Sequence, residues 1–316
     1  MRFLLVALAV AAPHYEIGIG EQQAQMFSDP RFAALGLEHV RVMTPYDVAC
    51  RPSAHRYYLD IWLDAAERAG VRPLVAFSFS WQRWRRWKLP TYRTYLRCFR
   101  AFRARYPGVW DFNPWNEANH SAQPTFRHPR KAAGFYNAMR RACPRCQVAA
   151  GDLLDWFNIG RWLERYRPHL RGRPRLWSLH NYIDVNRPRR WLESGTRTLL
   201  RKTRGRVWVT ETAGVVHSRR YSDYDERRAA RATRMMFAFA RRSPRIERVY
   251  AYQWQASCDP DLWDSAWIRS DGSARPAYSV IVGELARSRG AAFDSAAALD
   301  PGLAAGARDT CAETAP

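Results

Sequence analysis

The feature that most constrains the fold is a regular alternation of two kinds of segment along this chain of 316 residues. Short β-branched and apolar runs, typical of buried strands, fall at residues 15–20, 39–43, 71–77, 109–115, 148–152, 176–182, 207–211 and 248–254. The first helical segment is a short turn at residues 32–37. Longer segments with helical periodicity fall at residues 57–69, 92–106, 129–142, 159–166, 191–203, 225–242 and 276–286. Strands that alternate with helices predict parallel βαβ units. Eight units over about 270 residues favour an α/β fold, the (β/α)8 or TIM barrel.

An open, doubly wound sheet is the rival arrangement. That fold carries a Gly-rich phosphate-binding loop after its first strand, and no such loop follows residues 15–20. Polar and aromatic residues also follow many of the predicted strands, whereas an open sheet would gather them at one crevice. We therefore expect a single barrel domain over residues 13–287.

The two ends of the chain differ in composition from the predicted barrel. Arg2 precedes an apolar run, residues 4–12, with small residues near its end, which is the pattern of a short secretory signal peptide. We therefore expect residues 1–12 to be a signal and the protein to be secreted or associated with the cell envelope; the alternative is a wrongly assigned start that leaves the first strand exposed. The run is too short to span a bilayer. From Ser288 the sequence is rich in Ala and Gly, so residues 288–316 are predicted to be a flexible tail unless Cys311 tethers it.

Six cysteines, at positions 50, 98, 143, 146, 258 and 311, form an even set that suits an exported protein with disulfide bonds. Their pairing does not follow from the sequence. Cys143 and Cys146 have the spacing of a redox motif or half of a zinc site, but a second CxxC is missing. A local disulfide is the favoured interpretation, and we expect no metal and no cofactor.

The chain is strongly basic, with 51 Lys+Arg against 29 Asp+Glu and a formal net charge of +22. Only three of the cations are lysines, so a lineage bias towards arginine on solvated helix faces explains much of the excess. The alternative is attraction to an anionic wall polymer, acidic polysaccharide or nucleic acid. No zinc-finger spacing, RNA-binding signature or basic heptad is present, so no nucleic-acid partner is expected.

Two carboxylates stand at the ends of predicted strands. Asn116-Glu117 follows the run at 109–115, and Glu211 ends the run at 207–211. Parallel barrels keep their reactive groups at this end of the strands, and hydrolysis of a glycosidic bond needs two carboxyl groups that flank it. An isolated Glu would more often cap a helix or pair with an arginine, but two at matching strand ends favour a common chemistry.

These positions resemble the large clan of retaining glycoside hydrolases with (β/α)8 barrels, which includes cellulases, mannanases, xylosidases and endo-β-glucanases. The resemblance covers residues 15–287. It implies that Glu117, after Asn116 on strand four, is the acid/base and that Glu211 on strand seven is the nucleophile. One departure is Ala118, where many members have Pro, and this affects the shape of the loop more than the chemistry.

Four further positions match the clan, and the resemblance gives each a role. Arg41 corresponds to an arginine beside the nucleophile, and His180 and Tyr182 on strand six correspond to a His-x-Tyr pair with a supporting role. Trp254 on strand eight corresponds to a tryptophan that forms a platform for the substrate. In the loop after strand three, Trp81 or its neighbour Trp84 could stack on a sugar, or the loop could be a lid that packs its own indoles.

The charges of these groups suggest how each would act. Arg41 and Tyr182 can keep Glu211 ionised for attack, whereas Glu117 needs a raised pKa to protonate the leaving oxygen. Asn116 can donate to a sugar 2-hydroxyl, and retention requires the two carboxyl groups to be about 5 to 5.5 Å apart.

Three aspartates also lie near the predicted strands. Asp152 could line the cleft or cap a loop, and the sequence does not decide between the two. Asp111 and Asp155 are interpreted as structural.

The sequence thus predicts a secreted retaining glycoside hydrolase with a carbohydrate substrate. Aromatic residues make up 14% of the chain, including 14 Trp, which suits a cleft for sugar rings. The alternatives are a catalytically inactive barrel that binds an envelope glycan and, less favoured, a basic nucleic-acid-binding protein. Loss of binding at modest salt would indicate the latter.

Overall fold

The computed structural model of the chain describes residues 14–187, 191–219, 222–259, 262–290 and 293–300. The predicted signal, residues 1–12, lies outside the described residues. So do Cys311 and the end of the predicted tail, residues 301–316.

Nine parallel strands form one sheet in the order β5-β4-β3-β2-β1-β9-β8-β7-β6. They are β1 (Glu16–Gly20), β2 (His39–Pro45), β3 (Arg72–Ser78), β4 (Asp111–Asn113), β5 (Gln147–Val148), β6 (Ala150–Leu154), β7 (Leu176–His180), β8 (Arg206–Thr212) and β9 (Ile246–Tyr252). The two ends of this order, β5 and β6, are separated in sequence by Ala149 alone, whose amide donates to the carbonyl of Phe112 in β4 (3.0 Å). They are consecutive halves of one barrel strand. The sheet therefore closes as the predicted (β/α)8 barrel of a single α/β domain.

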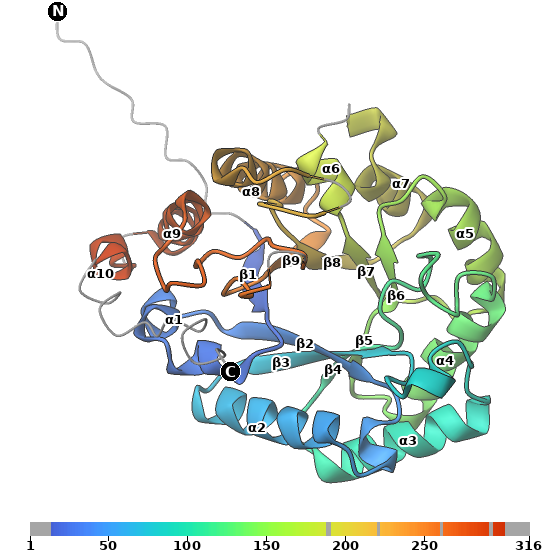
Figure 1. Cartoon of the computed structure of the whole chain (residues 1–316). Helices are drawn as coiled ribbons and strands as arrows, with labels where there is room; N and C mark the ends of the chain where they lie inside the picture. The colour runs from blue at the N-terminus through green and yellow to red at the C-terminus, as the bar shows by residue number, and fades with distance from the viewer. Residues whose placement is uncertain (1–13, 188–190, 220–221, 260–261, 291–292, 301–316) are drawn as a thin grey trace, which may run out of the picture.

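Helices form a ring outside the strands (Figure 1). The α-helices are α1 (Pro30–Leu35), α2 (Ala54–Arg68), α3 (Tyr92–Arg105), α4 (Pro129–Ala142), α5 (Ile159–Tyr166), α6 (Tyr182–Asn186), α7 (Gly195–Lys202), α8 (Glu226–Ala240), α9 (Pro276–Arg289) and α10 (Ser295–Leu299). Short 3-10 turns are η1 (Ala24–Ser28), η2 (Val48–Cys50), η3 (Arg83–Arg85), η4 (Arg167–His169) and η5 (Trp191–Glu193). Within the described ranges, no helix is long and apolar enough to cross a membrane.

Two of the strands predicted from the sequence extend further at their C-terminal ends than the strands in the structure. Residues 176–182 were expected to be one strand, but β7 ends at His180 and Tyr182 begins α6. The carboxylate of Asp155 accepts the amides of Ile183 (3.2 Å) and Asp184 (2.6 Å), which bends the chain into this helix. These bonds agree with the structural role interpreted for Asp155.

Strand β9 likewise ends before Trp254, which the sequence placed on strand eight. The amide of Trp254 donates to the carboxylate of Glu21 (2.9 Å). A side chain therefore satisfies this amide, and Trp254 lies in the loop that follows the strand.

Part of the predicted tail is folded against the barrel. Helix α9 continues to Arg289, and α10 follows with its N-terminus capped by Asp294, whose side chain accepts the amides of Ala296 and Ala297. The hydroxyl of Tyr278 donates to the carbonyl of Ala298 (2.9 Å), and Ala298 is buried. The described residues of this segment thus form a docked helix where a flexible chain was expected.

The period-two alternation of strand residues separates two layers of side chains. On β2, Val40 and Val42 belong to the main apolar core beneath the helices, so Arg41 between them points into the barrel. A second apolar cluster belongs to the strands alone: Leu74, Ala149, Leu176, Trp208 and Tyr250. Gly18 leaves room for one of these, since a Cβ there would lie 2.8 Å from the ring of Tyr250.

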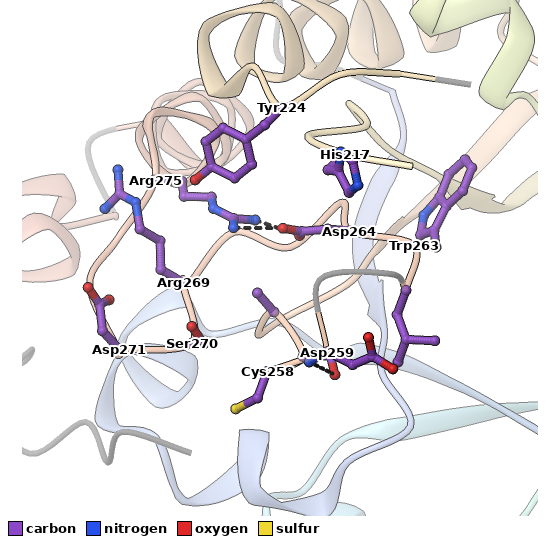
Figure 2. Close-up of a pocket in the computed structure, with 13 residues that line it drawn as sticks. His217, Tyr224, Cys258, Asp259, Trp263, Asp264, Arg269, Ser270, Asp271 and Arg275 are labelled. Carbon is purple, nitrogen blue, oxygen red and sulfur yellow. Dashed lines mark hydrogen bonds and ion pairs between the residues drawn. The ribbon is translucent and has the colours of Figure 1, made fainter. Parts of the chain in front are cut away.

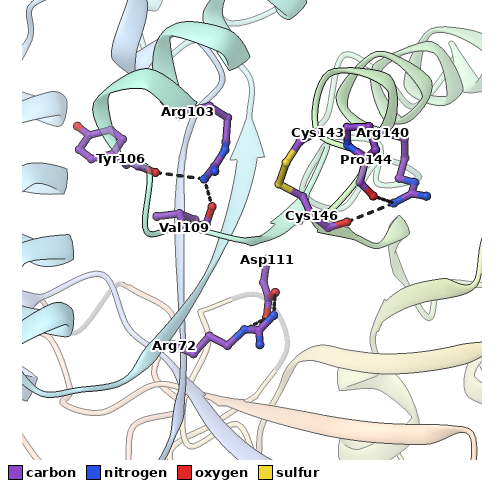
Figure 3. The surroundings of a disulfide bond; sticks show 9 residues. All are labelled: Arg72, Arg103, Tyr106, Val109, Asp111, Arg140, Cys143, Pro144 and Cys146. Carbon is purple, nitrogen blue, oxygen red and sulfur yellow. Dashed lines mark hydrogen bonds and ion pairs between the residues drawn. A yellow bond between two sulfur atoms is a disulfide. The ribbon is translucent and has the colours of Figure 1, made fainter.

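Two disulfides are described. Cys50–Cys98 joins η2 to α3, and Cys143–Cys146 closes the turn after α4 (Figure 3), which confirms the predicted local disulfide. The same figure shows Asp111 at the start of β4 paired with Arg72. Together with the ion pair that Asp111 makes to Arg248 (2.9 Å), this matches its interpretation as a structural residue.

Candidate active site

The two glutamates of the prediction meet at one histidine. Nδ1 of His180, at the end of β7, lies 3.3 Å from Oε1 of Glu117 and 3.5 Å from Oε2 of Glu211. The two carboxylate oxygens are therefore less than about 7 Å apart, a limit within which the expected separation of about 5 to 5.5 Å fits. Their side chains are 20% and 15% exposed, so a ligand can reach both.

Backbone contacts fix Glu117 beyond the end of β4. The amide of Asn116 donates to the carbonyl of Phe77 on β3 (2.6 Å), and the amide of Ala118 donates to the carbonyl of Asp152 (3.3 Å). Between them, Glu117 has a φ of 47°. A non-glycine residue in this left-handed region is uncommon, and such residues cluster at functional sites.

Arg41 links the two sides of the site. Its Nη1 donates to Oε2 of Glu211 (2.7 Å), and its Nη2 donates to Oδ1 of Asn116 (2.7 Å). The hydroxyl of Tyr182 donates to the other oxygen of Glu211 (2.9 Å). The sequence placed these side chains together, and the structure brings them into direct contact, with Glu211 accepting from one cation and one hydroxyl.

Asp152 is the central residue that the sequence left undecided. It is fully buried, lies 3.2 Å from both Arg41 Nη2 and His180 Nε2, and accepts from the hydroxyl of Thr210 (2.5 Å). The pairing of β6 with β7 shifts register between Gly151 and Leu153, so Asp152 is the bulged residue and has a φ of 62°. Bulges re-aim side chains next to active sites, and this one directs a carboxylate onto the two buried cations.

The electrostatics follow from this ring of charges. Burial would lower the pKa of His180, but the carboxylates of Asp152 and Glu211 outweigh it and raise this pKa to about 10. Burial would raise the pKa of Asp152, but the positive charges of His180 and Arg41 outweigh it and lower this pKa to about 2. His180 is therefore an imidazolium cation at neutral pH.

The pKa of Glu117 corrects the expectation from the sequence. Burial acts to raise this pKa, but the hydrogen bond and positive charge of His180 outweigh burial, so the pKa is lowered. The sequence assigned His180 a supporting role without a charge. It is the charge, sustained by Asp152, that reverses the shift expected for an acid catalyst.

The two tryptophans predicted to meet the substrate have other contacts in the structure. Trp254 is 1% exposed and packs against Trp267 and Tyr278, with ring centroids 6.0 and 6.2 Å away, so it belongs to the core and offers no open platform. Trp81 is half-buried and stands edge-on to His55 at 4.8 Å.

Two other tryptophans pack against residues of the site. Trp263 packs on Tyr182 (5.1 Å), and Trp156 packs on His120 (5.9 Å), whose Nδ1 is 3.6 Å from Oε2 of Glu117. Both lie in loops after strands, where only the three-dimensional fold shows what they touch.

A cavity of about 420 Å³ adjoins this site on the side of the loops after β8 and β9 (Figure 2). Trp263 lines it, so this indole contacts Tyr182 and also faces the cavity. Arg275 and Asp264 form a bidentate pair in the cavity wall, at 2.6 and 2.7 Å. The volume is within the range of pockets that hold small ligands.

No metal site emerges from these groups. Among the residues that the structure describes, no cluster of three or more His, Cys, Asp or Glu side chains could hold a metal ion. The carboxylates of the site have Arg41 and His180 as their cationic partners.

No protein-family model and no curated protein matches the sequence. The fold, however, is similar to those of solved glycosidases. A glucosidase from Croceicoccus marinus superposes with a TM-score of 0.59 at 12% identity, covering 88% of this chain and 67% of that one. A β-glucosidase from Thermotoga maritima in complex with deoxynojirimycin gives a TM-score of 0.56 at 9% identity, covering 87% and 99%. At these identities the likeness establishes the barrel fold.

Proposed function

We propose that this protein is a retaining glycoside hydrolase that cleaves a β-linked polysaccharide or oligosaccharide by double displacement. The observation that carries the proposal is the convergence of Glu117 and Glu211 on one nitrogen of His180, at the end of the barrel where such folds keep their reactive groups. The similarity of the barrel to solved glucosidases supports the same class of reaction.

In the first step, Glu211 attacks the anomeric carbon while Glu117 protonates the departing glycosidic oxygen. A covalent glycosyl-enzyme forms, and the aglycone leaves. Arg41 and Tyr182 hold one oxygen each of Glu211 and so orient the nucleophile. Oδ1 of Asn116 accepts from Arg41, so Nδ2 of Asn116 is left as the donor for a sugar 2-hydroxyl.

In the second step, ionised Glu117 takes a proton from water, and the resulting hydroxide attacks the same carbon. The bond to Glu211 breaks, and the sugar is released with its original configuration. The lowered pKa of Glu117 suits this step directly. For the first step, a bound glycan must raise that pKa by excluding water and separating Glu117 from the charge of His180.

The primary test is product release from β-glucans, xylan, mannan and arabinogalactan. Wild type is compared with Glu117→Gln and Glu211→Gln, and with Glu67→Gln on the exposed surface of α2 as the matched control. Both site variants should lose at least 100-fold in kcat/KM and the control should lose nothing. Wild type that binds one of these polymers yet cleaves none would identify a glycan-binding barrel instead.

Azide rescue separates the two roles on an aryl β-glycoside. In Glu211→Ala, azide replaces the nucleophile and attacks from its face, so the product is the α-glycosyl azide. In Glu117→Ala, azide attacks the glycosyl-enzyme and yields the β-glycosyl azide. Azide products of the opposite configurations would exchange the two assignments.

We also propose that the protein is secreted or associated with the cell envelope. The signal-like residues 1–12 and the two disulfides support this location, since disulfides persist in oxidising compartments. N-terminal sequencing of protein recovered from the medium should show a chain that begins after residue 12. Recovery of the full-length chain from the cytoplasm alone would contradict export.

A further inference from the structure

The loop between β3 and α3 has a composition found nowhere else in the chain. We call residues 79–88 the aromatic–cationic loop, because within ten residues it contains four aromatic side chains, four cations and no carboxylate: Phe79, Trp81, Trp84, Trp87, Arg83, Arg85, Arg86 and Lys88. Trp84 is 65% exposed and Trp87 is 59% exposed. Two neighbouring indoles in solvent indicate a surface that meets a ligand.

The cations of this loop lie beside its aromatic rings. The guanidinium of Arg85 is 5.2 Å from the ring centroid of Trp84, and Nζ of Lys88 is 5.7 Å from the same centroid. The guanidinium of Arg86 is 5.2 Å from the ring of Phe79 and 5.6 Å from that of Trp87. Each exposed indole therefore has a positive charge at its side.

These cations also lack the carboxylate partners that other arginines have. Arg269 pairs with Glu226 and Arg105 pairs with Asp60, both at 2.6 Å. In the part of the chain that the structure describes, none of the four cations of the loop makes a salt bridge. The carboxylate beneath the loop, Asp47, accepts from the hydroxyl of Ser80 (2.8 Å) and lies 3.9 Å from Arg51.

The loop connects to the residues around Glu117. Arg85 donates to the hydroxyl of Tyr46 (3.3 Å), and the ring of Tyr46 stacks on Trp115 at 6.1 Å, two residues before Glu117. The loop follows β3, so it lies at the same end of the barrel as Glu117 and Glu211. A polymer chain bound at the two glutamates can therefore extend across it.

We infer that the aromatic–cationic loop is a subsite for anionic sugar units, so that the substrate is an acidic β-linked polysaccharide. Sugar rings present an apolar C–H face that packs on an indole, and a carboxylate or sulfate on the ring pairs with an arginine. The alternating indoles and cations match a polymer that repeats both features. The inference rests on the proposed function and specifies that the glycan substrate is anionic.

A lid that packs its own indoles would have a different structure. It would bury Trp84 and Trp87, and its cations would point to solvent or to carboxylates of the barrel. The exposure of both rings and the cations beside them favour a ligand surface, while the net charge of +22 brings an anionic polymer to the protein from a distance.

The test measures binding in the Glu211→Gln background, where the polymer is not cleaved. The probes share one β-glucan backbone: hydroxyethyl cellulose is neutral, carboxymethyl cellulose carries carboxylates, and cellulose sulfate carries sulfates. The loop variants are Trp84→Ala and Arg86→Gln/Lys88→Gln. The matched control is Trp110→Ala, since Trp110 is 37% exposed and stacks with Arg103 at 4.6 Å, but precedes β4 at the opposite end of the barrel.

Trp84→Ala should weaken binding of all bound celluloses at least tenfold, whereas the double cation variant should weaken only the anionic ones. The stronger of the two anionic probes identifies carboxylate or sulfate as the group recognised. Equal affinity for neutral and anionic celluloses, or equal loss in Trp110→Ala, overturns the inference. Single-stranded DNA that competes fully and shows the same loop dependence also overturns it, because the loop would then be a general polyanion surface.

The outcomes separate this inference from the proposed hydrolase. Loop-dependent binding of carboxymethyl cellulose by a wild type that cleaves no polymer would leave the subsite in place and remove the enzyme. Cleavage of a neutral glucan with no effect of either loop variant would support the hydrolase and overturn the subsite.

Discussion

The charge on His180 makes the stability of the protein depend on pH in a defined way. The pKa of this buried imidazole is raised from its ordinary 6.5 to about 10. Since one pKa unit corresponds to about 1.4 kcal/mol, the difference amounts to about 5 kcal/mol of stabilisation. The folded protein keeps the proton up to about pH 10, and the unfolded chain releases it near 6.5. The contribution is therefore complete below pH 6.5 and is lost as the pH rises to 10.

Integrated between pH 7 and pH 9, this loss is roughly 2–3 kcal/mol, a large part of the 5–15 kcal/mol typical of a domain. Urea unfolding at both pH values and fixed ionic strength, followed by tryptophan fluorescence, gives the free energy of unfolding directly. His180→Gln removes the titrating group, and its free energy of unfolding should change by less than about 1 kcal/mol over the same interval. A wild type that is equally stable at both pH values, or a variant with the same loss, would refute the buried imidazolium.

Substitutions at three further places test the contacts around the site and the cross-links. Arg41→Lys keeps the charge but cannot bond Glu211 and Asn116 at once, so kcat/KM should fall at least 100-fold while circular dichroism is unchanged. Burial and the charge of Asp184 raise the pKa of Asp155, and its two carboxyl oxygens accept one backbone amide each; Asp155→Asn, which keeps one acceptor oxygen, should therefore cost about 1–2 kcal/mol in thermal melts, whereas Asp155→Ala leaves both amides unpaired and should cost about 2–4 kcal/mol. A loss for Ala no larger than that for Asn would contradict these two hydrogen bonds. Replacing Cys50 and Cys98, 48 residues apart, should cost about 4 kcal/mol, against about 1.5 kcal/mol for Cys143 and Cys146, 3 residues apart; calorimetry that shows equal losses would argue against loop length as the cause.

The positions of the two glutamates and of Arg41 follow from local patterns in the sequence. Strand ends in a parallel barrel face the same way, so Glu117 and Glu211 were expected to lie on one side. Alternation on β2 turns Arg41 inward between Val40 and Val42. These features depend on the type and period of each element, which the sequence encodes over a few residues.

The role of Asp152 and the burial of Trp254 depend on tertiary structure. The bulge at Asp152 aims its carboxylate at Arg41 on β2 and at His180 on the neighbouring strand β7. The sequence around Gly151 and Asp152 is compatible both with a bulged strand residue and with a residue that caps a loop, so it does not distinguish the two. Trp254 is covered by α1 and α9, whose approach no strand pattern predicts.

The charges of the site favour one half of the proposed reaction over the other. Three carboxylates, Glu117, Asp152 and Glu211, share two cations, Arg41 and His180. When Glu211 becomes an ester, it loses its charge, and the cations are left with two carboxylates. Glu117 is then held more firmly as an anion, which is the form that activates water. The first step needs the opposite state, so the energy for protonating Glu117 must come from binding the glycan, and kcat should persist to higher pH than kcat/KM.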